Sequence, residues 1–189
     1  MNRLSAFFAA SAGELKNLRS LTLASLLTAI YAVSYSPFAG NIVIIPGFME
    51  FRFGFLAIAM AAMLLGPVPG VLVALIGDFI GTIVFYGGSF FFGYPLSWAL
   101  MGLMFGCILY KGKISTPRIL LAMALNSLVI NQVFTTLWQS MLGFGAFQPL
   151  FFARIPRTLI MFPINTVLTV LVLRSVYAVY HRIGRTAIK

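Results

Sequence analysis

The stretch from Phe51 to Gly81, FRFGFLAIAMAAMLLGPVPGVLVALIGDFIG, decides the fold. It holds a short apolar run over about residues 51–65 and most of a second run over about 71–86. An α-helix needs roughly 20 apolar residues to cross about 30 Å of hydrocarbon, and the two runs approach that length. Between the runs lie Gly66, Pro67, Pro69 and Gly70, which predict a tight turn without charge. The stretch therefore predicts two membrane-spanning helices joined by a short turn.

The composition of the whole chain supports this interpretation. Of its 189 residues, 61% are hydrophobic and only 8% are charged, whereas a soluble domain carries about 25% charged residues. Mean hydropathy is +1.02. We therefore expect an integral membrane protein in which residues 1–189 form a single domain. Residues 1–18 carry too much charge for a span and predict an N-terminal tail, either an interfacial amphipathic helix or a loose segment.

The apolar runs along the chain predict an all-α membrane protein, a bundle of six transmembrane helices. The runs are apolar on all sides, whereas the strands of a membrane barrel alternate in polarity. Pro117 and Pro156 predict the first turns of the last two helices, because Pro there lacks only a donor that would be unpaired anyway. The predicted spans cover about residues 21–38, 51–65, 71–86, 95–110, 119–142 and 155–177.

Basic residues predict the orientation of the bundle. With six helices, the N-terminal tail, the connection between the fourth and fifth helices and the C-terminal end share one side. This side carries most of the basic residues and should be cytoplasmic, so both termini are expected in the cytoplasm. The residues concerned are Arg3, Lys16, Arg19, Lys111, Lys113, Arg118, Arg174, Arg182, Arg185 and Lys189.

Three arginines fall at the opposite, external ends of their helices: Arg52, Arg154 and Arg157. Arg154 and Arg157 are three residues apart and share a helix face. If the last helix begins near Pro156, its N–H groups and dipole add to a site for an anion that is open to the exterior. The alternative is that these arginines reach lipid phosphates or pair with Glu50.

Several functional classes are excluded by residue content. The chain has one cysteine, Cys107, and one histidine, His181, so we expect neither a disulfide nor a Cys/His metal site. No nucleophile–base pair is apparent, so no catalytic residues are predicted and the chain is not expected to be an enzyme. No phosphate-binding loop for ATP is present. The charges are scattered between apolar spans, which argues against binding to nucleic acid.

Five motifs in the chain resemble those of the S components, the substrate-binding subunits of energy-coupling factor (ECF) vitamin transporters. The first set, Arg52 to Phe55, Leu65 to Gly70 and Asp78 to Gly81, is similar to the whole superfamily. The stretches TTLWQSMLGFGAF, from Thr135, and ARIPRTLIMFPIN, from Ala153, resemble the folate group. The resemblance covers about residues 21–172. It implies a multi-pass protein of the bacterial plasma membrane that captures folate from outside.

The same resemblance implies partner subunits. An S component docks on a shared transmembrane subunit that carries two ATPases, so any ATP hydrolysis would be theirs. The family typically shows Ala-x-x-x-Ala in the first helix, and the nearest matches here are Ala24 to Thr28 and Ser25 to Ala29. Both keep the small-residue spacing that lets helices approach closely. Packing within the bundle is the alternative role for Ala24, Ser25, Thr28 and Ala29.

If the ligand is folate, its chemistry selects a set of candidate binding residues. Its two tail carboxylates match the planar guanidinium groups of Arg52, Arg154 and Arg157. Asp78, an acid within an apolar span, could accept two N–H bonds from the pterin, or could pair with an arginine or asparagine in the bundle. The aromatic candidates are Tyr94, Trp98 and Trp138, with Phe90 and Phe92 nearby. The amide candidates are Asn131 and Asn165. Gln132 is a further polar residue in an apolar span, and Asn126 is left out because it lies near the cytoplasmic end. No cofactor is expected.

Other functions remain open on the sequence alone. An S component for another vitamin is the nearest alternative, although riboflavin has no charge for three arginines, and pantothenate and biotin carry one carboxylate each. An intramembrane enzyme would need a nucleophile, a base or a metal site, and the sequence shows no such set. A passive channel would need a polar stripe along one pore-lining face, which the sequence does not show.

Overall fold

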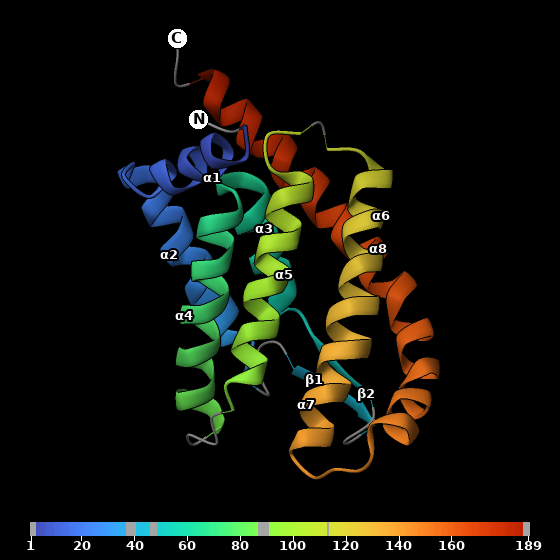
Figure 1. Ribbon diagram of the computed structural model, residues 1–189. Helices are drawn as coiled ribbons and strands as arrows, with labels where there is room; N and C mark the ends of the chain where they lie inside the picture. Colours follow the sequence, from blue (N-terminus) through green and yellow to red (C-terminus); the bar gives the residue numbers. More distant parts are fainter. Residues whose placement is uncertain (1–2, 37–40, 46–48, 87–90, 113, 187–189) are drawn as a thin grey trace.

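A computed structural model describes residues 3–36, 41–45, 49–86, 91–112 and 114–186. Within these ranges the chain is almost entirely helical, with one short hairpin of strands (Figure 1). The elements are α1 (Arg3–Glu14), α2 (Leu18–Val33), β1 (Asn41–Ile45), β2 (Met49–Arg52), α3 (Gly54–Leu65), α4 (Pro67–Tyr86), α5 (Gly93–Leu109), α6 (Thr116–Leu125), the π-helix η1 (Asn126–Phe134), α7 (Thr135–Met141) and α8 (Phe147–Thr186).

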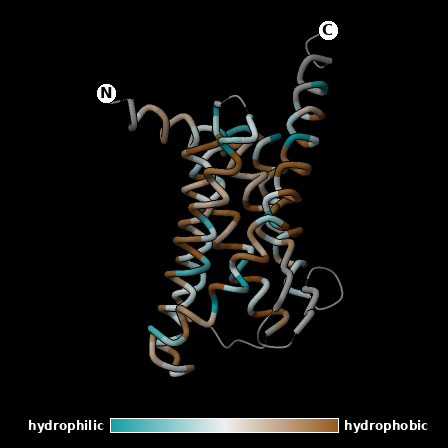
Figure 2. Tube along the Cα trace, turned by 90° about the vertical axis from the view of Figure 1, so that its right-hand side faces the viewer, coloured by the Kyte–Doolittle hydropathy of each residue, from teal (hydrophilic) through white to brown (hydrophobic). Residues whose placement is uncertain are grey.

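Each of the six predicted spans overlaps one apolar helical segment. The segments Pro67–Phe85, Thr116–Met141 and Phe147–Tyr180 are long and apolar enough to cross a membrane. The helices α2, α3 and α5 are apolar but shorter. Figure 2 shows hydrophobic residues along the length of the helices. Many large apolar side chains on α2, α4 and α8 point outward and are exposed, which suits contact with lipid chains.

The core of the bundle is built around α3, a helix of small and apolar residues. Its Ala57, Ile58, Ala59, Ala61 and Ala62 are all fully or almost fully buried. The helix contacts α2, α4, α5 and α8. Because alanine side chains are small, the backbones of these neighbouring helices can approach α3 closely. Small residues at the interface are typical of helix packing within membranes.

Glycines bring α4 and α5 into direct backbone contact. A Cβ atom at Gly102 would lie 2.6 Å from the carbonyl oxygen of Gly70, and one at Gly106 would lie 2.4 Å from Cα of Pro67. No side chain fits at either position without moving the backbone. These two residues therefore fix how α5 lies against the start of α4.

The turn between α3 and α4 is shorter than the sequence predicts. Gly66 alone makes it, with φ of +100°, and α4 begins at once with Pro67. The remaining residues of the GPVPG motif form the first turn of α4, because Pro lacks only a donor that this turn does not use. The expected start of the third span at Val71 is therefore wrong by one helical turn.

The N-terminal segment forms a helix that packs on this turn. Ser11 of α1 is fully buried. Its hydroxyl donates to the carbonyl oxygen of Leu65 at 3.2 Å and accepts from the N–H of Val68 at 3.1 Å. One side chain thus satisfies a backbone group at the end of α3 and another at the start of α4. Of the two forms expected for residues 1–18, the helix is the one observed over Arg3–Glu14.

A short hairpin precedes α3 and was not predicted. β1 and β2 are antiparallel, with Asn41 opposite Arg52 and Val43 opposite Glu50. The register shifts between Val43 and Ile45. The all-α description therefore holds for the bundle but not for residues 41–45 and 49–52. The helix within the second predicted span begins at Gly54, because Phe51 and Arg52 belong to β2.

The two ends of the molecule differ. Figure 1 places both termini and the α5–α6 connection at one end, and the hairpin and the α7–α8 connection at the other. The first end contains the three regions in which the sequence concentrates its basic residues. This common location agrees with the predicted arrangement of the chain.

The last helix begins well before its predicted start. α8 starts at Phe147, with Pro149 in its first turn, so Pro156 and Pro163 lie inside it. An internal proline removes one backbone hydrogen bond and pushes away the carbonyl four residues earlier, which bends a helix. α8 changes direction along its length in Figure 1. The prediction that Pro156 opens this helix is therefore wrong.

Candidate functional site

Arg154 is held in a polar cluster between α8 and the preceding helical segment. Its Nη1 donates to Oε1 of Gln139 on α7 at 2.5 Å, and its Nη2 donates to the carbonyl oxygen of Asn131 on η1 at 3.3 Å. Its Nε is buried and makes no hydrogen bond with the residues that the structure describes. Both acceptors are neutral, so the hydrogen bonds orient the guanidinium without cancelling its charge.

The second arginine lies one turn further along α8. Arg157 is half-buried, like Arg154, and the two like charges are close enough to interact. Tyr94 on α5 also lies within electrostatic range of Arg154. The structure therefore brings together Arg154, Arg157, Tyr94 and Asn131, all four of which the sequence marks as candidates.

The helix N-terminus predicted beside these arginines is not there. The N–H groups near Arg154 and Arg157 lie inside α8, which begins seven residues before Arg154 at Phe147. Unpaired N–H groups and the positive end of the dipole are confined to the first turn of a helix. Any attraction for an anion at this place must therefore come from the side chains of the arginines.

An aromatic group lies next to this polar cluster. Nε1 of Trp138 on α7 donates to the hydroxyl of Ser97 on α5 at 2.7 Å. The ring of Phe91 lies 5.8 Å from that of Trp138 and 5.9 Å from that of Tyr94. Phe134 packs against Trp138 from η1, with ring centroids 5.9 Å apart. Tyr94, whose ring packs on Phe91, also lies within electrostatic range of Arg154, so flat apolar surfaces and this cation share one region.

Asp78 lies in a separate buried cluster on α4. Its carboxylate is 2% exposed. Oδ1 accepts hydrogen bonds from the hydroxyls of Tyr35 and, at 3.5 Å, Tyr31, and these two hydroxyls lie 3.1 Å apart. Two tyrosines of α2 are therefore hydrogen-bond partners of Asp78. Tyrosine hydroxyls can offset part of the cost of burying a carboxylate.

The helix α5 connects the two clusters. Trp98 packs its ring against that of Tyr31, with centroids 6.4 Å apart. The neighbouring residue, Ser97, accepts the hydrogen bond from Trp138. Trp98 and Trp138 therefore belong to adjoining parts of one region, which runs from Asp78 on α4 to Arg154 on α8.

The remaining candidates lie outside these two clusters or have side chains that the structure does not describe. Arg52 ends β2, on the hairpin at the same end of the molecule as the α7–α8 connection, and its side chain lies outside the described residues, as does that of Glu50. Asn165 is half-buried about two turns beyond Arg157 on α8. Phe90 also lies outside the described residues.

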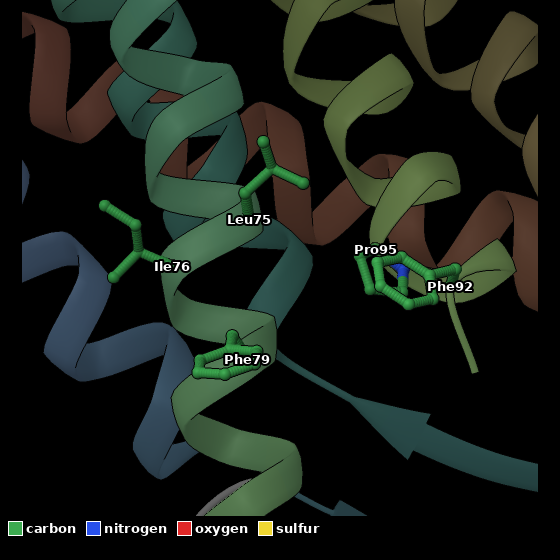
Figure 3. A pocket seen from close by; sticks show the side chains of 5 residues that line it. All are labelled: Leu75, Ile76, Phe79, Phe92 and Pro95. Atoms are coloured by element: carbon green, nitrogen blue, oxygen red, sulfur yellow. The ribbon is translucent and has the colours of Figure 1, made fainter. Parts of the chain in front are cut away.

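An apolar groove of about 330 Å³ lies between α4 and α5. Figure 3 shows its five lining side chains, Leu75, Ile76, Phe79, Phe92 and Pro95. None of them can donate or accept a side-chain hydrogen bond. The groove therefore offers nothing to a charged ligand, and Phe92, 81% exposed, is a groove residue in this structure.

The proposed docking residues of α2 divide between two faces. Ala24 is buried against Leu27, Ala61, Leu65 and Val73. Ser25 and Ala29 are exposed, and Thr28 is half-buried. Ala24 thus packs within the bundle, which was the alternative role, whereas Ser25 and Ala29 present a small-residue face outward.

Several residues of the two clusters are not prominent in the sequence. Ser97 is a single polar residue without a motif, and Gln139 lies within the TTLWQSMLGFGAF stretch but was not singled out as a candidate. Tyr31 and Tyr35 carry a usable signal, since their spacing of four places both on one helix face. Gln132 is marked by the sequence only as a polar residue in an apolar span, yet it makes two hydrogen bonds to α8, to Phe151 and Thr158.

A family model described as "ECF transporter, substrate-specific component" matches residues 19–173. The chain belongs to this family. Among curated proteins, a folate transporter FolT of Clostridium novyi is 33% identical over 115 residues, which are 61% of this chain and 67% of that protein. A folate transporter FolT of Leuconostoc mesenteroides is 29% identical over 153 residues, 78% of this chain and 80% of that protein.

The fold agrees with this membership in the ECF family. A solved structure described as "Crystal structure of FolT bound with folic acid" matches with a TM-score of 0.74 and 25% identity. The match covers 84% of this chain and 95% of the other. The resemblance inferred from the sequence motifs is therefore confirmed, and the chain is a membrane transport component.

Proposed function

We propose that this ECF substrate-specific component captures folate at the end of the bundle that holds the α7–α8 connection. The folate transporters and the folic acid complex that it resembles support this substrate. The observation that carries the proposal is the state of Arg154. Its guanidinium is oriented by two neutral acceptors, its Nε is buried without a hydrogen bond among the described residues, and Arg157 lies one turn away.

Two carboxylates on a flexible tail match this pair of cations. A guanidinium binds a carboxylate through two parallel N–H···O bonds, and these charge-assisted bonds are about twice as strong as neutral ones. Arg154 and Arg157, with Arg52 from the hairpin, would hold the tail. The flat pterin would lie against Tyr94, Trp98 and Trp138, with Asp78, Asn131 and Asn165 supplying hydrogen bonds.

The remaining parts of the proposal concern orientation and partners. The binding end faces outward and both termini face the cytoplasm of a bacterial cell, since the basic regions gather at the end with the termini. Six helices cross the plasma membrane. The chain docks on an ECF transmembrane subunit with two ATPase subunits, which hydrolyse ATP. It is itself no enzyme and holds no cofactor.

A direct identification of the ligand tests the substrate. The protein would be purified in detergent and denatured, and any released compound would be identified by mass. Titration with folate, pantothenate, biotin and riboflavin, followed by Trp fluorescence, would rank the candidates. Saturable binding of folate at the lowest concentration supports the proposal. Preference for another vitamin would replace the substrate and leave the family unchanged.

A further inference from the structure

Gln132 connects η1 to α8 at two points. Its side chain is 4% exposed. Nε2 donates to the backbone carbonyl of Phe151 at 2.6 Å, and Oε1 accepts from the hydroxyl of Thr158 at 2.7 Å. A glutamine amide has one donor end and one acceptor end, and here each end contacts a different turn of the same helix.

The two contact points lie on either side of Pro156. Phe151 is five residues before this proline and Thr158 two residues after it. The helix is weakened between them, because Pro156 cannot donate to the carbonyl of Phe152. A side chain that is hydrogen-bonded to the helix on both sides of Pro156 can set the bend of α8. Arg154 and Arg157 both lie in the segment between the two contacts.

The segment that contacts α8 here, η1, is a π-helix. A run of nine residues in this form is unusual, and π-helical turns often occur at functional sites. The hydroxyl of Thr135 donates to the carbonyl of Ile130, five residues back. The carbonyl of Asn131 accepts from Arg154. Adjacent residues of η1 thus hold α8, one through its backbone and Gln132 through its side chain.

We infer that Gln132 is a positioning residue, which sets the bend of α8 and thereby the placement of Arg154 and Arg157 toward the ligand. The identity of that ligand rests on the proposed function; the placement of the arginines does not. Gln132 itself needs no contact with the ligand. Its loss leaves both guanidinium groups in the protein but lets their segment of α8 take other orientations, which weakens binding of a carboxylate tail.

The binding experiment compares folate with a pterin that lacks the glutamate. Gln132→Met keeps the length of the side chain and removes both hydrogen bonds. It should weaken folate binding about tenfold and change the affinity for the pterin less than about twofold. Thr158→Val removes one bond at nearly constant shape and should weaken folate binding about threefold. Thr158→Ser keeps the hydroxyl and should bind folate like wild type.

A matched control is available on the same helix. Thr169 is fully buried and its hydroxyl contacts the carbonyl of Asn165 and the sulfur of Met123, beyond the arginines. Thr169→Val should therefore leave folate affinity within about twofold. Equal losses for folate and pterin in Gln132→Met and Thr158→Val, or a loss in Thr169→Val as large as in Thr158→Val, would mean that these residues only support the fold, and the inference would be wrong.

A second measurement needs no ligand. Spin labels would be attached at Leu128 on η1 and Leu159 on α8, both exposed, after replacement of Cys107 by alanine. The distribution of distances between the labels should be broader in Thr158→Val than in Thr158→Ser. An unchanged distribution would contradict the inference. Failure of wild-type protein to bind folate, together with a broadened distribution in Thr158→Val, would overturn the proposed substrate and leave the role of Gln132 standing.

Discussion

The guanidinium of Arg154 donates to the side-chain carbonyl of Gln139 at 2.5 Å, across the α7–α8 interface. A neutral amide can fix the direction of a cation but cannot neutralise it. Partial burial lowers the effective dielectric constant around the guanidinium, which strengthens its attraction for an anion that enters the site. The contact thus orients Arg154 and leaves its charge to act on a ligand.

Removal of either arginine should weaken binding of folate and spare the pterin. Charge-assisted hydrogen bonds are worth about 1.5–3 kcal/mol, so Arg154→Gln or Arg157→Gln should weaken folate binding roughly ten- to a hundredfold. A pterin without glutamate should bind each variant like wild type. Fluorescence titration in detergent measures both ligands. Arg174→Gln, an exposed arginine whose partner is Thr116, serves as the control. Equal losses for both ligands would exclude a role as tail clamp.

Asp78→Asn should weaken binding of both ligands. The carboxylate of Asp78 accepts from Tyr31 and Tyr35 and lies in the half of the region assigned to the pterin. The amide has one acceptor oxygen and no charge, so the affinities for folate and pterin should fall by a similar factor of about ten. Titration of the same two ligands checks this outcome. Normal affinity for both would mean that Asp78 serves only the packing of α2 on α4.

Bulky residues on the two faces of α2 should have different effects. Ser25→Trp and Ala29→Trp add volume on the exposed face, so folate binding by the isolated protein should persist while uptake by cells with the complete transporter falls. Ala24→Trp places the ring in the core, and overpacking costs typically 1–3 kcal/mol. Folded yield and melting temperature in detergent should fall for this variant alone. Normal uptake in both Ser25→Trp and Ala29→Trp would remove this face as the docking surface.

Gly102→Ala should destabilise the bundle. The added Cβ would lie 2.6 Å from the carbonyl oxygen of Gly70, so α4 and α5 would have to separate. We expect a loss of about 1–3 kcal/mol, seen as a lower melting temperature in detergent. Gly13→Ala in α1 is the matched control, since its Cβ would meet nothing within 4 Å. Identical melting temperatures for both variants would contradict the close approach of the two helices.

Labelling of single cysteines should establish the orientation. In a variant without Cys107, Phe144→Cys in the α7–α8 connection should react with a membrane-impermeant thiol reagent added to intact cells. Lys111→Cys in the α5–α6 connection should react only after the membrane is opened. Both positions are exposed, so access to the reagent depends on the side of the membrane. Reversed labelling would place the arginine cluster in the cytoplasm and refute capture from outside.

The sequence by itself determined the class of the protein and the position of its apolar helices. Hydrophobic runs separated by glycine, proline and charge are local features, and burial in lipid requires little more than their length and polarity. For the same reason the grouping of basic residues at one end could be predicted, and the motifs around Arg52, Asp78 and Trp138 pointed to the family. The sequence also marked Arg154, Arg157, Tyr94 and Asn131 as binding candidates, and their role in binding stays a prediction.

Only the tertiary structure decided where α8 begins and what each polar side chain contacts. Pro149 and Pro156 are both possible first-turn residues, and the structure has Pro149 in the first turn and Pro156 inside the helix. The contacts of Gln132 and Gln139 with α8 also join residues that are apart in sequence. Likewise, Asp78 meets tyrosines of α2 because the packing of α2 on α4 brings them within reach. Hydrogen-bond partners far apart in sequence are set by helix packing in three dimensions, and no local pattern encodes that geometry.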